Sequence, residues 1–243
     1  MSEFRIYAAL AAFPLIWIFV FDWWHAGWAA KHHTLVLPPE IARKREESNR
    51  PLVLAKYALL LLVMRDLVGN RLWQIVPVSV HSQPWVVLLA SGIVCGIVIV
   101  SLQTFLSSLS VGSLFSKGNE YFLRGSVSVW LIIFLIGGLV EEFWRAICIR
   151  GLVRNGHGPF SANLLTAFAF SVAHQSGLPS RIAPGLGVAA TEVVIALVFG
   201  ALFIWSGNII PPILASVIYY IFIFFSVRRS GLNTSRPSGS APT

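Results

Sequence analysis

Residues 126–153 read SVSVWLIIFLIGGLVEEFWRAICIRGLV, and this stretch decides the fold. Residues 126–140 carry no charge. Two adjacent glutamates, Glu141 and Glu142, then precede more apolar chain and Arg145. A helix of about 20 apolar residues can cross a bilayer. An ionised carboxylate inside such a helix costs from roughly 3 to above 10 kcal/mol, so it is usually paired, buried in a bundle or functional. The glutamates therefore indicate either a functional site or a structural polar cluster within a membrane-spanning helix.

The composition of the whole chain agrees with a membrane protein. Of its 243 residues, 56% are hydrophobic and 12% are charged, and the mean hydropathy is +0.75. Soluble domains carry about 25% charged residues. We therefore predict an all-α fold, a polytopic helical bundle in a lipid bilayer. The net charge of +8 comes from Lys and Arg in loops and tails, where such residues orient helices, so no nucleic-acid partner is expected.

The apolar runs predict about seven transmembrane helices. Their expected ranges are 7–24, 51–69, 84–106, 126–153, 160–178, 184–206 and 209–226. The chain divides accordingly into N-terminal spans and loops (1–120), a core (121–226) and a tail (227–243). Because the tail is rich in Gly, Ser and Pro and has little apolar content, we expect it to be disordered. Lys and Arg are more numerous on the side of the odd-numbered loops, which predicts a cytoplasmic C-terminus.

The fourth and fifth predicted helices bring polar groups to one depth. Gly156 is a suitable stop for the fourth helix, which places Glu142 roughly 16 Å from its end. His174 lies roughly 21 Å along the returning fifth helix, so Glu141 or Glu142 can meet it. Arg145 follows the glutamates by four and three residues, spacings that permit an ion pair. One glutamate can therefore hold Arg145 while the other, with the imidazole, activates a water as a general base.

Each of these residues also has a structural interpretation. The Glu–Arg pair and His174 could simply lock two helices together. Glu192, early in the sixth predicted span, is either a third site residue or an interfacial glutamate. Phe170 lies beside the candidate site and is of a type that often serves in packing.

The motifs EEFWRA (141–146) and FSVAH (170–174) resemble those of the CPBP family of intramembrane proteases, which includes the type II CAAX prenyl protease and bacterial Abi-type proteins. That family carries EExxxR on one helix and FxxxH on the next, and the resemblance covers about residues 120–225. The glutamate motif here is one residue shorter. The histidine of the last core helix, often followed four residues later by Asn or Asp, is replaced by Ser216 and Tyr220.

The resemblance implies an endopeptidase that cleaves a membrane protein or lipidated peptide, in a multi-pass protein of a bacterial plasma membrane. Glu142, or Glu141 in the shifted alignment, would be the general base. His174 would orient water or stabilise the oxyanion, and Arg145 would fix the glutamates. Ser216 or Glu192 could replace the missing histidine. A catalytic zinc needs three protein ligands, a set that this core poorly supplies, so we expect no metal or other cofactor.

Two other functions compete with the peptidase. The missing histidine favours a catalytically inactive, immunity-like protein that binds a membrane partner. A small transporter would also use an intramembrane glutamate–histidine pair. No internal repeat of the kind many transporters show is present.

Overall fold

The computed structural model describes residues 3–18, 39–69, 83–110, 127–176 and 186–234. These residues form helices and contain no strand, which confirms the all-α prediction. The seven helices are α1 (Glu3–Trp17), α3 (Pro39–Val68), α5 (Trp85–Ser110), α7 (Val127–Arg154), α8 (Pro159–Ser176), α9 (Leu186–Ser206) and α10 (Ile210–Thr234).

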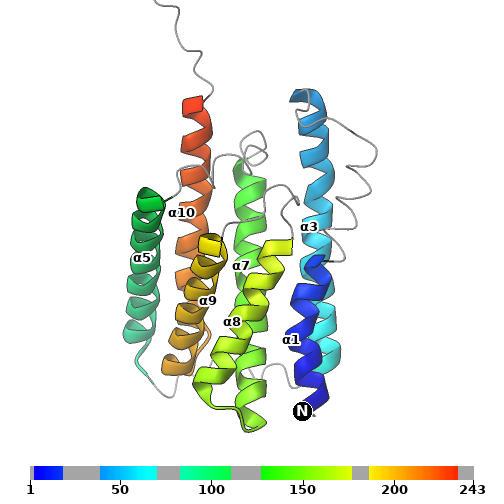
Figure 1. The fold of residues 1–243 in the computed structure, drawn as a ribbon, viewed down its shortest axis with the longest axis vertical. Coiled ribbons are helices and arrows are strands. Elements are labelled where there is room, and N and C mark those ends of the chain that lie inside the picture. The colour runs from blue at the N-terminus through cyan, green and yellow to red at the C-terminus, as the bar shows by residue number, and fades with distance from the viewer. Residues whose placement is uncertain (1–2, 19–38, 70–82, 111–126, 177–185, 235–243) are drawn as a thin grey trace, which may run out of the picture.

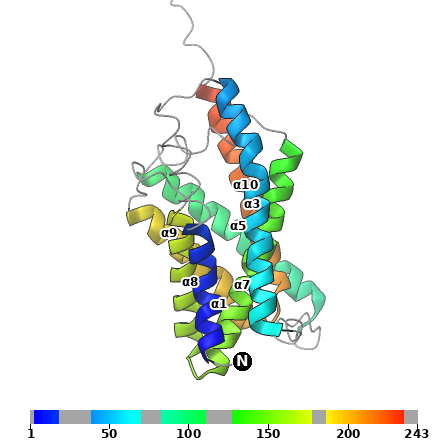
Figure 2. The ribbon, with the colours of Figure 1, turned by 90° about the vertical axis from the view of Figure 1, so that its right-hand side faces the viewer.

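Helix α7 is the centre of the bundle. It contacts α1, α3, α8, α9 and α10, while α5 packs on the outer side of α10 (Figure 1). Viewed from the side, α1 lies next to α8 (Figure 2). Along the C-terminal half of α7, from Glu141 to Leu152, most side chains are buried, those of Trp144 and Ile147 among them. This burial on all sides explains why the sequence of α7 shows no polar stripe.

The end of α7 is the one that Gly156 predicts. Gly156 has a φ of 91°, which only glycine adopts without strain. Its N–H bonds the Val153 carbonyl at 3.1 Å, and the His157 N–H bonds the Leu152 carbonyl at 3.1 Å. These two bonds form a Schellman cap, which satisfies carbonyls that the helix leaves open. The chain then turns back into α8.

Two helices extend further than their apolar runs. Helix α3 begins at Pro39, where residue 51 was expected, and α10 continues to Thr234, where 226 was expected. Residues 227–234 are therefore helical, which corrects the prediction of a disordered tail for that part. The α3 extension, PEIARKREESNR, is rich in Ala, Arg, Lys and Glu, which favour helix without being apolar. The α10 extension, VRRSGLNT, contains two arginines and directly continues a helix that has already formed. Residues 235–243 lie outside the described part.

One described segment, Trp85–Phe105 of α5, is long and apolar enough to cross a membrane. Two shorter apolar helical segments, Ala190–Ser206 and Ile210–Ser226, accompany it. Apolar side chains on α5 are exposed, including those of Val86, Val94 and Val98. An exposed apolar face of this length suits contact with lipid.

Candidate functional site

Glu141 lies at the centre of the candidate site, buried on α7. Its Oε1 accepts a hydrogen bond from the Tyr57 hydroxyl of α3 at 3.0 Å. Its Oε2 accepts one from the Tyr220 hydroxyl of α10. Two phenols from helices far apart in sequence thus fix both carboxylate oxygens, and bonds to a charged acceptor are the stronger kind.

Two glycines of α7 make room for these tyrosines. A Cβ on Gly137 would lie 2.5 Å from the Tyr57 hydroxyl oxygen, and one on Gly138 would lie 2.8 Å from the Tyr220 ring. Gly137 is one helical turn before Glu141, so the tyrosine that crosses over it reaches the carboxylate. The GG dipeptide in LIGGLV therefore allows α3 and α10 to approach α7 at this level.

His174 approaches the same carboxylate from α8. Its Nε2 lies 3.7 Å from Glu141 Oε1. Its Nδ1 lies 3.0 Å from the Phe170 carbonyl oxygen. A carbonyl can only accept, so Nδ1 carries the proton in this contact and Nε2 is directed at Glu141. The His174 side chain is 24% exposed and that of Glu141 is 2% exposed, so the imidazole is the more accessible member of the pair.

Glu142 has a different partner. It forms a buried ion pair with Arg145, three residues along α7. The Arg145 guanidinium carbon lies 4.7 Å from the centre of the Phe170 ring and 5.4 Å from that of Phe199. The pair is thus enclosed by aromatic rings, an arrangement suited to arginine. Among the described residues, Arg145 Nε and one terminal nitrogen have no hydrogen-bond partner.

An aromatic stack from α1 covers one side of the site. Phe13 stacks on Trp144 at 4.6 Å and on Phe170 at 5.7 Å between ring centres, and its ring lies 5.8 Å from His174. Phe170 in turn stacks on His174 at 4.1 Å. The Trp144 indole N–H bonds the Ala9 carbonyl at 2.8 Å, which fixes α1 against α7. These contacts restrict the rotamers of the imidazole.

The structure thus divides the sequence-predicted residues into two groups. Glu141, His174 and Phe170 meet, and Glu142 with Arg145 forms an adjoining pair on the same helix. The positions of the glutamates and the histidine along two antiparallel helices had predicted this contact. The catalytic roles of these residues remain predictions.

The two residues considered as substitutes for the missing histidine have other contacts. The buried Ser216 hydroxyl donates to the Ile213 carbonyl at 3.0 Å, within its own helix. Glu192 is half-buried on α9, near enough to Tyr219 for an electrostatic interaction. Tyr220, four residues after Ser216, is the residue of α10 that bonds Glu141.

Sequence analysis missed two residues of α3. Tyr57 bonds Glu141 directly. The buried Lys56 places its ammonium 3.8 Å from the centre of the Trp17 ring and interacts electrostatically with Glu141. A lysine in the middle of an apolar run was the available signal, because an intramembrane cation usually has a partner or a function.

The described side chains do not fit a zinc site. Within the described ranges, no three His, Cys, Asp or Glu side chains form a group that could hold a metal ion. Glu141 and His174 supply two possible metal ligands, and the side chains that bond Glu141 are tyrosine hydroxyls. A catalytic zinc takes three protein ligands, commonly His, Cys or carboxylate.

Comparison with protein-family models gives a match in the second half of the chain. A family model described as "Rce1-like: Type II CAAX prenyl endopeptidase Rce1-like" matches residues 123–222, less than half of the chain. Neither the curated proteins nor the solved structures that were searched contain a match. The matched segment runs from just before α7 into α10 and includes Glu141, Glu142, His174 and Tyr220. It confirms the resemblance that the EEFWRA and FSVAH motifs predict.

Proposed function

We propose, from the match of residues 123–222 to the type II CAAX prenyl endopeptidase Rce1-like family model, that this chain is an intramembrane endopeptidase in which Glu141 activates the attacking water. The family consists of integral membrane proteins and supports protease activity of the CAAX type. The observation that carries the finer assignment is the distance of 3.7 Å between Glu141 Oε1 and His174 Nε2. Glu142 is engaged by Arg145, which leaves Glu141 as the carboxylate that faces the imidazole.

The proposed reaction needs a water near both groups. A water at about 2.8 Å from each atom is compatible with their spacing, because it would lie to one side of the line between them. Glu141 takes a proton from this water as its oxygen bonds to the peptide carbonyl carbon. The proton then passes to the leaving amine nitrogen as the C–N bond breaks. His174 orients the water through Nε2, while Tyr57 and Tyr220 hold the carboxylate in one orientation.

The proposed substrate is a membrane protein or a lipidated peptide, and no metal takes part in the proposed step. A peptide bond has to reach a buried carboxylate, and the more accessible His174 marks the side from which it would enter. The lipid bilayer surrounds the bundle, and the exposed apolar side chains of α5 suit that environment. We also propose a multi-pass topology in a bacterial plasma membrane with a cytoplasmic C-terminus, because Lys and Arg are concentrated on that side.

The test is cleavage by purified full-length protein in membranes. Wild type, Glu141→Gln and His174→Ala are compared, and Phe168→Leu serves as a control because this side chain is exposed on α8, away from the site. The new termini of candidate membrane proteins are read by mass spectrometry, with and without a chelator. We expect cleavage that both site variants lose, that the control retains and that the chelator leaves unchanged. Cleavage by Glu141→Gln at the wild-type rate would contradict the assignment of the base.

A non-catalytic function is the second candidate. It is favoured by Ser216, which stands where the family carries a histidine and donates to the carbonyl of Ile213 in its own helix. A protein of this kind would bind a membrane partner without using the glutamate chemistry. It would capture that partner equally well as wild type and as Glu141→Gln, and neither form would generate a new terminus.

A further inference from the structure

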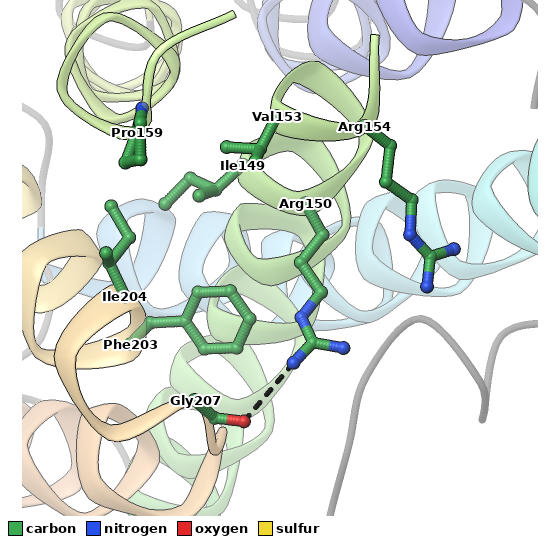
Figure 3. A pocket seen from close by; sticks show the side chains of 8 residues that line it. All are labelled: Ile149, Arg150, Val153, Arg154, Pro159, Phe203, Ile204 and Gly207. Carbon is green, nitrogen blue, oxygen red and sulfur yellow. Dashed lines mark hydrogen bonds between the residues drawn. The ribbon is translucent and has the colours of Figure 1, made fainter. Parts of the chain in front are cut away.

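A second candidate site lies at the end of the bundle where α7 and α9 end and α8 begins. It is a pocket of about 360 Å³ (Figure 3). Its lining consists of Ile149, Arg150, Val153, Arg154, Pro159, Phe203, Ile204 and Gly207. Along α7, Arg150 is nine residues from Glu141, roughly 13 Å, so the pocket is separate from the glutamate site.

The pocket has one basic and one apolar side. Figure 3 shows the two guanidiniums on one side, and Pro159, Ile204 and Phe203 on the other. The Arg150 guanidinium carbon lies 5.6 Å from the centre of the Phe203 ring. None of the lining residues is acidic. The pocket therefore offers positive charge beside an apolar wall.

The two arginines are four residues apart on one helix, so their charges repel each other. Arg150 donates to the Gly207 carbonyl at 3.3 Å, a contact that caps the end of α9. This bond uses one of the five donors of a guanidinium. Arg154 is exposed at the last turn of α7, where a cation favours the helix dipole. The bond to Gly207 explains the position of Arg150 and the helix dipole that of Arg154, while an anion between the two guanidiniums would relieve their repulsion.

We propose that this pocket binds the phosphate of an anionic phospholipid, with an acyl chain against Ile149, Phe203 and Ile204. The ends of helices in an integral membrane protein lie near the headgroups, where basic pockets between helices bind anionic lipids. Guanidinium groups bind phosphate through paired hydrogen bonds. The apolar wall favours a phospholipid over a free phosphate, because a free phosphate would leave that wall uncovered.

The test measures binding to the purified full-length chain in a neutral detergent. The probes are dihexanoyl phosphatidylglycerol, dihexanoyl phosphatidylcholine and inorganic phosphate. The variants are Arg150→Gln and Arg154→Gln. Arg65→Gln is the matched control, since Arg65 is exposed in the last turn of α3 at the same end of the bundle. Arg154 is exposed, so its variant folds even if removal of the Arg150 cap impairs folding.

We expect phosphatidylglycerol to bind more tightly than phosphatidylcholine. Each pocket variant should weaken its binding about fivefold, as the loss of one cation near an anionic lipid predicts. Arg65→Gln should bind as the wild type does. Equal affinity for the two lipids, or unchanged binding in both pocket variants, would overturn the proposal. If inorganic phosphate bound as tightly as phosphatidylglycerol, the pocket would be a site for a free anion and the lipid proposal would be wrong. Binding is measured without a peptide substrate, so the result is independent of the proposed peptidase activity.

Discussion

Tyr220 of α10 donates a hydrogen bond to Glu141 of α7, from the position at which the resembling family often carries Asn or Asp. The last core helix therefore still supplies a polar group to the site although its histidine is absent. Tyr57 completes the arrangement from α3, outside the segment that matches the family. The carboxylate is thus held by one residue within the matched segment and by one outside it.

Removing the Tyr220 hydroxyl tests this arrangement. We expect Tyr220→Phe to lower the free energy of unfolding by about 1.5–3 kcal/mol, since a hydrogen bond to a charged group is lost. The rate of peptide cleavage should fall as well, because the carboxylate can then rotate. Thermal unfolding in detergent and cleavage assays provide the two measurements. Tyr219→Phe is the control, as it removes a hydroxyl one residue away; equal effects of the two changes would contradict the role of Tyr220.

Gly137→Ala should disturb the site through Tyr57. The added Cβ would lie 2.5 Å from the Tyr57 hydroxyl oxygen, so the phenol has to move away from Glu141. We expect reduced cleavage and a lower midpoint of thermal unfolding. Gly158→Ala is the matched control, because a Cβ there would meet its nearest neighbour at 3.7 Å.

A double-mutant cycle then separates this effect from general damage to helix packing. In the Tyr57→Phe background, Gly137→Ala should cost clearly less cleavage activity than it does in the wild type, since the hydrogen bond is already absent. Additive losses would show that Gly137 acts independently of Tyr57.

The sequence predicted which segments are helices, and it predicted that the fourth and fifth of them, α7 and α8, pack against each other. Apolar runs identify the helices, and Gly156 marks the end of α7 because a Schellman cap favours glycine there. The predicted start of α3 and the predicted end of α10 were wrong, because polar and charged residues can continue a helix beyond its apolar part. Hydropathy identifies the apolar part of each helix and does not detect a polar extension of the same helix.

The contacts of Glu141 were beyond prediction for a different reason. Tyr57 is 84 residues away, and only the rotation of α3 and α10 about their axes directs a tyrosine at a given carboxylate. The same holds for the choice between the glutamates. Neighbouring side chains on a helix point about 100° apart, so different roles could be expected. Which of them faces His174 depends on how α7 packs among its neighbours.

The two glutamates should respond differently to neutralisation. Glu142→Gln leaves the buried Arg145 without its ion-pair partner, and breaking a buried pair costs about 3–5 kcal/mol of unfolding free energy. Glu141→Gln keeps one oxygen that can accept from one tyrosine hydroxyl, and its amide N–H can donate to the oxygen of the other hydroxyl, so we expect a smaller loss of stability together with a loss of cleavage. Unfolding is measured by denaturant titration in mixed micelles. A larger loss of stability for Glu141→Gln than for Glu142→Gln would contradict this division of roles.

Gly156→Ala should destabilise the turn between α7 and α8. A side chain at a φ of 91° is strained, and the two cap bonds to the Leu152 and Val153 carbonyls depend on that conformation. We expect a loss of about 1–2 kcal/mol in the free energy of unfolding. Gly158→Ala again serves as the control, because it lies in the same turn without a positive φ. The turn sets how α8 returns along α7, so the variant should also lower the cleavage rate at temperatures where it is still folded. An unchanged unfolding midpoint would show that the glycine conformation is not needed for the α7–α8 hairpin.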